Sequence, residues 1–242
     1  MMRLSIFIAL PSLFKDIFML DSIFSYTYPK SFVNRLRKNR FAQIETILHK
    51  LIEEKGRVRI LDLGGDLAYW KNMKWTNSAT HITLLNLSPS PIPEDLKNRF
   101  ESVQANALQC PFPDYSFDLV FSNSAIEHMG SRENQNVFAK EVKRLSHNYI
   151  VQTPSIWFPL EPHCRIPFFQ FIPHSIRAVL LMIFPVHYFP KARNYKEGVL
   201  ASKTTMMMGK KRFRSFFPHA SFFTEYLWGI PKSYTAIHLE KK

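Results

Sequence analysis

Asp62, Gly64 and Gly65 have the types and spacing of a ligand-binding turn. They lie in the stretch RILDLGGDLAYW, residues 59–70, and the pair uses two of only seven glycines in a chain of 242 residues. Glycine after a strand lets the backbone approach a ligand, because no Cβ intervenes and a positive φ costs little. An acid two residues before the pair would repel a pyrophosphate but could hold a cationic group. The stretch therefore predicts a site for a ligand with a cationic end.

The spacing of the glycines excludes two common nucleotide sites. The sequence has neither G-x-G-x-x-G, which a dinucleotide needs, nor G-x-x-x-x-G-K-[ST], the usual triphosphate loop. The two cysteines, Cys110 and Cys164, belong to no CxxC motif and no Cys/His cluster. A disulfide framework is therefore not predicted, and neither is a metal site. A reducing cytoplasm is the expected location.

Two further segments carry residues that could act as acids or bases. His128 lies in IEHMG, and Glu161 with His163 lies in WFPLEPHCR; each segment directly follows a predicted strand. A base beside a hydroxyl or amine assists its attack on an electrophile, so these three residues are the catalytic candidates. Each histidine has a structural alternative as a hydrogen-bonding residue. Glu127 either orients the loop backbone or contacts the ligand.

The elements that must position these residues are short apolar runs that alternate with helical segments. Residues 31–54 are predicted as a helix that ends at Gly56, and Phe138, Val142 and Leu145 form the buried stripe of another. Such alternation predicts right-handed βαβ units and a mostly parallel sheet, whose ligands bind beyond the carboxyl ends of the strands. The predicted strands are 58–63, 81–86, 100–105, 117–122 and 148–153.

The pattern changes after Pro154. Residues 154–194 form an aromatic and proline-rich insertion with few charges, which is expected to build the acceptor side of the site. A helix is predicted at 204–217, followed by two strands joined at a turn over 229–232. We expect an N-terminal arm at residues 1–30 and one domain at 31–242 that contains the insertion.

In order and spacing, these segments resemble the class I S-adenosylmethionine-dependent methyltransferases, in a type-11-like branch that acts on small molecules. ILDLGG resembles the first motif of that family, HITLLN its second strand, and ANALQCPFPDYSFDLVFSNSAIEHM its adenine-side segment and fourth strand. FFPHASFFTEYLWGIPKSYTAIH is similar to its sixth and seventh strands. The resemblance covers about residues 35–240. It implies a Rossmann-like three-layer α/β sandwich with a seven-stranded, mostly parallel sheet and an antiparallel last strand.

The resemblance also implies S-adenosylmethionine as the cofactor and assigns residues to it by position. Two departures concern the contacts: Asp66 and Ala68 stand where the family usually has glycines, and asparagines stand at 86 and 106 where it usually has acids. Asparagine still hydrogen-bonds, but without the charge-assisted contact of a carboxylate. The implied cofactor residues are Asp62, Gly64 and Gly65 for the methionine moiety, Asn86 for the ribose hydroxyls with Leu87 as a further cofactor contact beside it, Asn106 and Ala107 for the adenine, and Ser122 and Asn123 for the opposite side.

The expected function is methylation, on oxygen or nitrogen, of a small-molecule or glycan-type acceptor, because the insertion carries few charges. The net charge of +13 motivates an alternative acceptor, a nucleic acid and in particular RNA. Residues 30–59 hold nine Lys/Arg against three Glu, and residues 191–214 hold eight against Glu197 alone. Base-modifying enzymes of this kind often carry Asn/Asp-Pro-Pro-Tyr after the fourth strand, whereas this chain has SNSAIEH there.

A third alternative is a degenerate, non-catalytic protein that binds at a membrane surface. Its contacts would be the apolar residues 1–20 and the apolar stretch 168–190. Gln170, His174 and Arg177, together with prolines, make a membrane-spanning helix over that stretch costly. The sequence therefore predicts that this stretch is either a buried insertion or one that touches a membrane surface, and not a membrane span.

Overall fold

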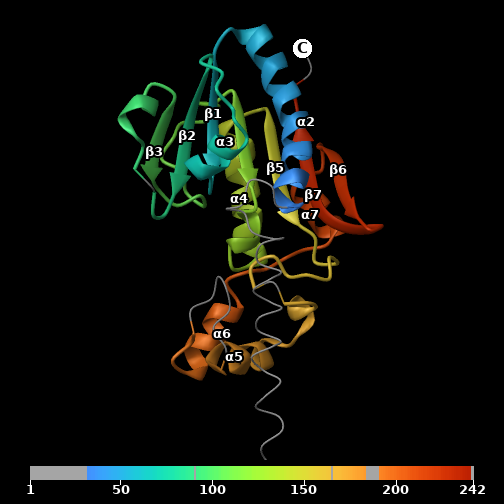
Figure 1. Cartoon of the computed structure of the whole chain (residues 1–242). Coiled ribbons are helices and arrows are strands. Elements are labelled where there is room, and N and C mark those ends of the chain that lie inside the picture. Colours follow the sequence, from blue (N-terminus) through green and yellow to red (C-terminus); the bar gives the residue numbers. More distant parts are fainter. Residues whose placement is uncertain (1–31, 90, 165, 184–190, 241–242) are drawn as a thin grey trace, which may run out of the picture. The chain divides into compact units, whose positions relative to one another are not determined.

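The computed structural model describes residues 32–89, 91–164, 166–183 and 191–240 (Figure 1). The described residues divide into two compact units, and the smaller contains 32–56 with 68–77. It holds helix α2 (Phe32–Lys55) and most of α3 (Leu67–Asn72), and Phe41 contacts Tyr69 and Trp70 edge to face with ring centroids 6.1 and 6.0 Å apart. The predicted arm at 1–30 lies outside the described residues.

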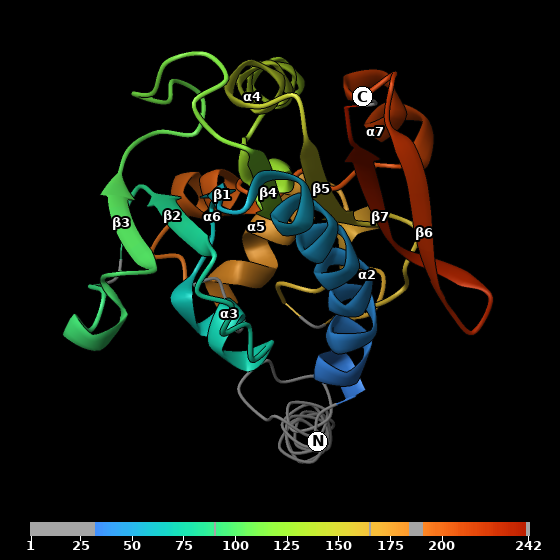
Figure 2. The ribbon, with the colours of Figure 1, turned by 90° about the horizontal axis from the view of Figure 1, so that it is seen from above.

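The larger unit is built on a seven-stranded sheet of order β3-β2-β1-β4-β5-β7-β6 (Figure 2). The pairs among β1 to β5 are parallel, whereas β7 is antiparallel to both β5 and β6. The predicted Rossmann-like sheet with an antiparallel last strand is confirmed. The strands are β1 (Val58–Leu63), β2 (Thr80–Asn86), β3 (Phe100–Gln104), β4 (Leu119–Asn123), β5 (Tyr149–Pro154), β6 (Ser221–Leu227) and β7 (Ile230–His238).

The central strands are continuous apolar runs because both of their faces are covered. In β1 every residue except Arg59 is buried, and in β5 every residue except Pro154 is buried. The exposed Arg59 at the amino end of β1 binds Asp118 through its backbone N–H, with N and Oδ2 2.8 Å apart. This contact ties β1 to the segment that leads into β4.

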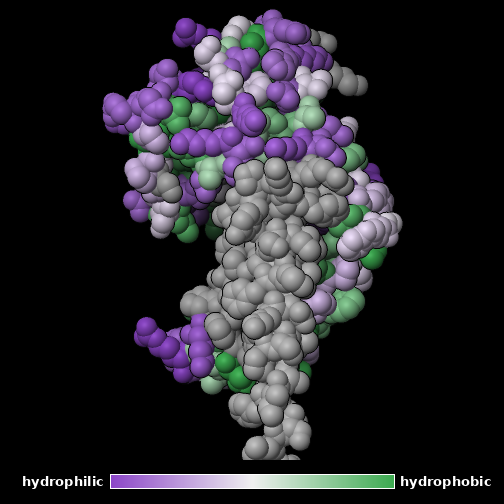
Figure 3. All heavy atoms as spheres, in the orientation of Figure 1, coloured by the Kyte–Doolittle hydropathy of each residue, from purple (hydrophilic) through white to green (hydrophobic). Residues whose placement is uncertain are grey.

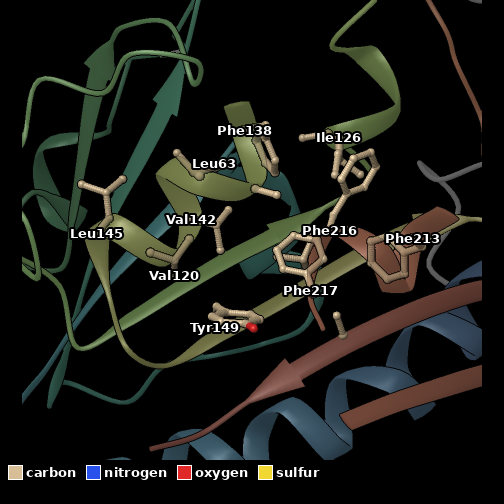
Figure 4. Packing of buried hydrophobic residues seen from close by; sticks show 14 of the residues in the cluster. Leu63, Val120, Ile126, Phe138, Val142, Leu145, Tyr149, Phe213, Phe216 and Phe217 are labelled. Carbon is tan, nitrogen blue, oxygen red and sulfur yellow. The ribbon is translucent and has the colours of Figure 1, made fainter. Parts of the chain in front are cut away.

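Helices α4 (Arg132–Leu145) and α7 (Lys210–Phe216) share one core with the sheet (Figure 4). The α4 helix begins where the Ser131 side chain accepts a hydrogen bond from the backbone N–H of Asn134, which satisfies one of the free donors of its first turn. Its apolar stripe buries Phe138, Val142 and Leu145 completely, as predicted. Removing one such large side chain from a core typically costs about 3–5 kcal/mol.

The insertion after β5 contains helix α5 (His174–Ile183), which contacts α6 (Tyr195–Ser202), the helix that directly follows the insertion. A small apolar cluster of Cys164, Phe169, Leu181 and Ala192 lies beneath them. Residues 184–190, the end of the predicted membrane-contacting stretch, lie outside the described residues. Among the helices described, none has the length and apolar character that crossing a bilayer requires.

The prediction of a helix over 204–217 is wrong in its first half. The helix begins only at Lys210, after Gly209, because the preceding backbone is bonded elsewhere. Met206 donates its N–H to the carbonyl of Glu127 (2.7 Å), and the carbonyl of Met208 accepts from Ile156 (3.2 Å). The turn predicted at 229–232 is also displaced, because β6 ends at Leu227 and β7 already begins at Ile230.

Three short 3-10 turns complete the larger unit: η1 (Glu94–Leu96), η2 (Ile126–His128) and η3 (Phe169–Phe171). On the face drawn in Figure 3, most of the coloured residues are hydrophilic, with small apolar areas between them. The basic residues Lys191, Arg193 and Lys196 at the start of α6 are exposed. At these three positions, the excess of basic residues in 191–214 therefore lies on a solvated surface.

Candidate active site

The glycine pair forms a tight turn at the carboxyl end of β1. Gly64 has φ of +76°, and a Cβ added there would lie 2.7 Å from the Cβ of Ala125, so no side chain fits. A Cβ added to Gly65 would overlap the carboxylate of Asp62. Asp62 is only 1% exposed, and its carboxylate therefore packs directly against the Cα of Gly65. The turn brings a buried acid and bare backbone to the same place.

Hydrogen bonds hold this turn to the ends of β2 and β3. Gly64 donates its N–H to the carbonyl of Leu85 (2.9 Å), and the side-chain amide of Asn86 donates to the carbonyl of Gly65. Leu87, just beyond β2, is 68% exposed, and its carbonyl accepts from the side chain of Gln104 (3.0 Å). Asn86 therefore fixes the glycine turn, while Leu87 offers an open apolar surface beside it.

Asn106 and Ala107 follow β3 in a compact turn. The side-chain oxygen of Asn106 accepts from the backbone N–H of Leu108 (2.9 Å). Arg144 of α4 holds the next residues in place, because its guanidinium donates to the carbonyls of Cys110 (3.2 Å) and Phe112 (2.8 Å). The loop after β3 therefore keeps a defined shape although it is not a regular element.

Ser122 and Asn123 end β4 in different ways. Ser122 is fully buried and donates its hydroxyl to the carbonyl of Leu63 (2.9 Å), which locks the ends of β1 and β4 together. The side-chain oxygen of Asn123 is buried and accepts no hydrogen bond from any described residue. A buried oxygen of this kind is costly unless a ligand or water satisfies it.

The three catalytic candidates from the sequence come together in one hydrogen-bonded chain. Glu161 accepts from the Nδ1 of His163 (2.7 Å) and from the backbone N–H groups of His163 (2.8 Å) and Cys164 (2.6 Å). The Nε2 of His163 lies 3.1 Å from the Nε2 of His128, with the two rings nearly perpendicular. Glu161 is buried, whereas His128 is exposed, so the chain leads from the protein interior to solvent.

Glu127 is a fourth member of this cluster. It is completely buried; one carboxylate oxygen accepts from the hydroxyl of Thr153 (3.1 Å), and the other has no hydrogen-bond partner among the described residues. A carboxylate oxygen of Glu127 and one ring nitrogen each of His128 and His163 all lie within 4.8 Å of one another. The sequence offered one signal for Glu127, its place beside His128, but none for its partner Thr153.

The cluster has a distinct electrostatic character. Burial raises the pKa of Glu127 to about 7, although His163 opposes this shift. Burial also opposes ionisation of Glu161, but hydrogen bonds from His163 and Cys164 outweigh it and hold its pKa below the usual range. Burial lowers the pKa of His163, but Glu161 and Glu127 outweigh it, so the net shift is upward. Packing around its ring and the neighbouring His163 lower the pKa of His128. At neutral pH His128 is therefore the neutral member of the chain.

Residues 61–148 match the family model described as a methyltransferase domain. These residues form a methyltransferase domain of the type-11-like kind that the sequence motifs implied, and S-adenosylmethionine is the cofactor of such domains. Comparison with curated proteins gives no match.

The fold is similar to those of solved methyltransferases. Two structures of the methyltransferase domain of a bacterial protein, CtHen1, have a TM-score of 0.50 with 15% and 13% identity. The similarity covers 84% of this chain and 100% and 97% of those chains. An S-adenosylmethionine-dependent methyltransferase from Methanosarcina mazei has a TM-score of 0.46 with 14% identity over 81% of this chain and 98% of that one. At such identities the comparison concerns the fold alone.

Replacing Gly65 by Ala should weaken the binding of S-adenosylmethionine without unfolding the protein. The new Cβ would displace the Asp62 carboxylate, so we expect the Kd to rise by at least about tenfold, which corresponds to about 1.4 kcal/mol. Isothermal titration calorimetry measures the change. The matched control is Gly209→Ala, because Gly209 also has a negative φ and its added Cβ would meet only the side chains of Trp157 and Ile156. Unchanged affinity in the folded Gly65→Ala variant would remove Asp62 from the site.

Proposed function

We propose that this chain transfers the methyl group of S-adenosylmethionine to a hydroxyl or amine of a small-molecule or glycan-type acceptor. The observation that carries this proposal is the cluster of Glu127, His128, Glu161 and His163, which is buried except at His128. Its members follow β4 and β5, at the same edge of the sheet as the glycine turn after β1. In a parallel sheet this is the edge at which ligands bind.

The features of the turn after β1 favour binding of the amino-acid end of the cofactor there. The Asp62 carboxylate would attract the cationic amino group, and Gly64 and Gly65, which have no side chains, would present bare backbone to the methionine chain. The unsatisfied oxygen of Asn123 would accept a hydrogen bond from the cofactor. Ser122 contributes indirectly, by holding the end of β1 through Leu63.

The loops after β2 and β3 would hold the nucleoside. Because Asn86 already donates to the carbonyl of Gly65, its side-chain oxygen is the atom we assign to the ribose hydroxyls. Leu87 would cover one face of the adenine. The oxygen of Asn106 is used within its own turn, which leaves its side-chain amide nitrogen to donate to the adenine ring, beside Ala107. These neutral contacts replace carboxylates, and we expect the affinity for the cofactor to be correspondingly modest.

The residues of the chain would contribute to the reaction by positioning the acceptor and by accepting its proton. S-adenosylmethionine supplies an electrophilic methyl group on a sulfonium that leaves as a neutral thioether. As the new bond to the methyl carbon forms, the acceptor loses a proton, which the neutral His128 would accept as a general base. Glu161, acting through His163, would stabilise the positive charge that the proton brings to the histidines. His128 is exposed and is therefore the member of the chain that an acceptor reaches first.

Exposed aromatic residues of the insertion favour a flat or ring-shaped acceptor. Trp157 is 61% exposed and Phe171 is also exposed, with their ring centroids 6.0 Å apart. Aromatic surfaces of this kind bind apolar faces of small molecules and of sugars, and no charge on them demands an ionic partner. Such rings also stack on unpaired bases, so it is the low charge of residues 154–194 that favours a small-molecule or glycan acceptor over a nucleic acid.

A labelling experiment identifies the acceptor class. The full chain is incubated with S-adenosylmethionine tritiated at the methyl group and with extract fractions of small molecules, glycans and RNA. We expect label in the first two fractions. Label that disappears with ribonuclease, together with RNA binding that weakens steeply with salt, would establish the nucleic-acid alternative. No label in any fraction, with cofactor binding intact, would indicate a non-catalytic member.

Replacing His163 by Gln should separate catalysis from cofactor binding. The change breaks the link between Glu161 and His128, so the labelling rate should fall by about 100-fold or more, as for loss of general acid–base assistance. The Kd for S-adenosylmethionine should change by less than about twofold, because His163 follows β5 and its side chain bonds to Glu161 and His128, whereas the glycine turn follows β1. The control is the exposed His147, replaced by Gln. Equal loss of rate and of cofactor binding would contradict this role.

Peripheral contact with a membrane is a second proposal, supported by one face of α5. Ile176, Val179 and Ile183 are exposed and lie on one side of the helix, and the exposed Lys191 and Arg193 follow in sequence. The two cysteines are free and buried, which suits a reducing cytoplasm as the location of such contact.

Flotation with vesicles tests the membrane proposal. The full chain should float with vesicles that contain phosphatidylserine and less with pure phosphatidylcholine. Val179→Asp should reduce flotation by at least about half, because a charge cannot enter the apolar layer cheaply. Tyr226→Asp, at an exposed residue of β6, is the control. If both variants float as the unmodified chain does, α5 takes no part in membrane contact.

A further inference from the structure

We propose that His128, His163 and Glu127 form a binding site for one divalent transition-metal ion. The three ligand atoms would be the Nε2 atoms of the two histidines and a carboxylate oxygen of Glu127. They come from two segments 35 residues apart, the turn η2 after β4 and the loop after β5. This separation explains why the spacing of residues in the sequence predicted no metal site.

The spacing of the ligand atoms fits a single ion. The two Nε2 atoms are 3.1 Å apart, and the Glu127 oxygen lies within 4.8 Å of both ring nitrogens. Metal–ligand bonds of about 2.0–2.2 Å place neighbouring ligand atoms about 3–3.5 Å apart and opposite ones about 4.4 Å apart. Binding would therefore draw the Glu127 oxygen toward the two nitrogens by at most about 1.3 Å, a movement that rotation of the side chain can supply.

Both histidine rings are held so that the same nitrogen faces the site. The Nδ1 of His163 is bonded to the Glu161 carboxylate at 2.7 Å, and Glu161 is itself fixed by two backbone N–H groups. The Nε2 of His128 faces the Nε2 of His163 at 3.1 Å, and the backbone of Thr204 lies near the other side of the His128 ring. Carboxylates and backbone carbonyls commonly orient metal-binding histidines in this way.

Glu127 provides the independent observation that points to a cation. Its side chain is fully buried, and one of its oxygens has no hydrogen-bond partner among the described residues. A buried carboxylate oxygen without a partner is expensive, and a positive ion beside it removes that cost. The Thr153 hydroxyl holds the other oxygen at 3.1 Å and so fixes the direction of the carboxylate.

The donor set selects the class of ion. Two imidazole nitrogens and one carboxylate oxygen favour Zn²⁺, Fe²⁺, Co²⁺ or Mn²⁺ over Ca²⁺ and Mg²⁺, which prefer oxygen. Three protein ligands leave at least one coordination position for a further oxygen. His128 is exposed, so this position can be reached from solvent.

The role of the ion rests on the proposed methylation, although its binding does not. An ion at this place would bind the acceptor oxygen and lower the pKa of its hydroxyl. The O–H proton would leave to water, the oxygen would form its bond to the methyl carbon, and the electron pair of the broken C–S bond would remain on sulfur. The ion would thus replace the proton that the two Nε2 atoms otherwise share.

Metal titration of the full chain tests the site without cofactor or acceptor. After treatment with EDTA and dialysis, Zn²⁺ is titrated by calorimetry, and Co²⁺ is titrated by its visible absorption, which reports the ligands directly. We expect one ion per chain and a rise in the melting temperature. His128→Gln and Glu127→Gln should each weaken binding by at least about tenfold, and Glu161→Gln by about 10–100-fold.

The controls separate this site from adventitious binding and from misfolding. His147→Gln, at an exposed histidine outside the cluster, should bind as the unmodified chain does. If Glu127→Gln fails to fold, His128→Gln still tests the site, because a substitution at the exposed His128 should not disturb folding. Absence of one-to-one binding, or equal binding by His128→Gln and the unmodified chain, would overturn the proposal. Because neither readout involves methyl transfer, the metal site and the proposed function can fail separately.

Discussion

The packing of the Asp62 carboxylate against the Cα of Gly65 is the constraint on which the rest of the site depends. It places a buried negative charge beside bare backbone at the end of the first strand of the sheet. Gly64, one residue earlier, has the Cβ of Ala125 where its own side chain would be. Ala125 directly precedes η2, which carries Glu127 and His128. The same turn that would receive the cofactor therefore fixes the start of the acid–histidine cluster.

This arrangement accounts for glycine at positions 64 and 65 in particular. Within this turn, only positions 64 and 65 have neighbouring atoms so close that a Cβ would not fit. Helix α3 already begins at Leu67. Asp66 and Ala68 therefore stand at positions where the packing of the turn makes no comparable demand. The remaining support comes from Asn86, whose side chain donates to the carbonyl of Gly65 and so stiffens the turn from β2.

The sequence predicted the sheet well because its signals are local. Residues 58–63 and 81–86 are continuous apolar runs, and strands covered on both faces have that pattern regardless of their neighbours. The helix predicted from residue 204 began too early, because long-range hydrogen bonds from Met206 and Met208 hold that segment extended. Propensity cannot anticipate such contacts.

The candidate site was predictable in part for the same reason. His128, Glu161 and His163 were found because each follows a strand, and strands of a parallel sheet end at one edge. The bond between Glu161 and His163 spans two residues and was within reach of the sequence. The approach of His163 to His128 joins residues 35 positions apart, and only the pairing of β4 with β5 creates it. Thr153 bonds one oxygen of Glu127 and so sets the direction of the carboxylate, and nothing in the sequence pointed to this contact.

The central claim is that Asp62 and the glycine turn hold the amino-acid end of S-adenosylmethionine. Calorimetric titration of the unmodified chain and of Asp62→Asn with S-adenosylmethionine tests it most directly. The account predicts one-to-one binding that the substitution weakens by at least about tenfold, because the charge-assisted contact with the amino group is lost. Absence of heat and of any thermal shift at millimolar cofactor in the unmodified chain, or equal affinity in the folded variant, would contradict it.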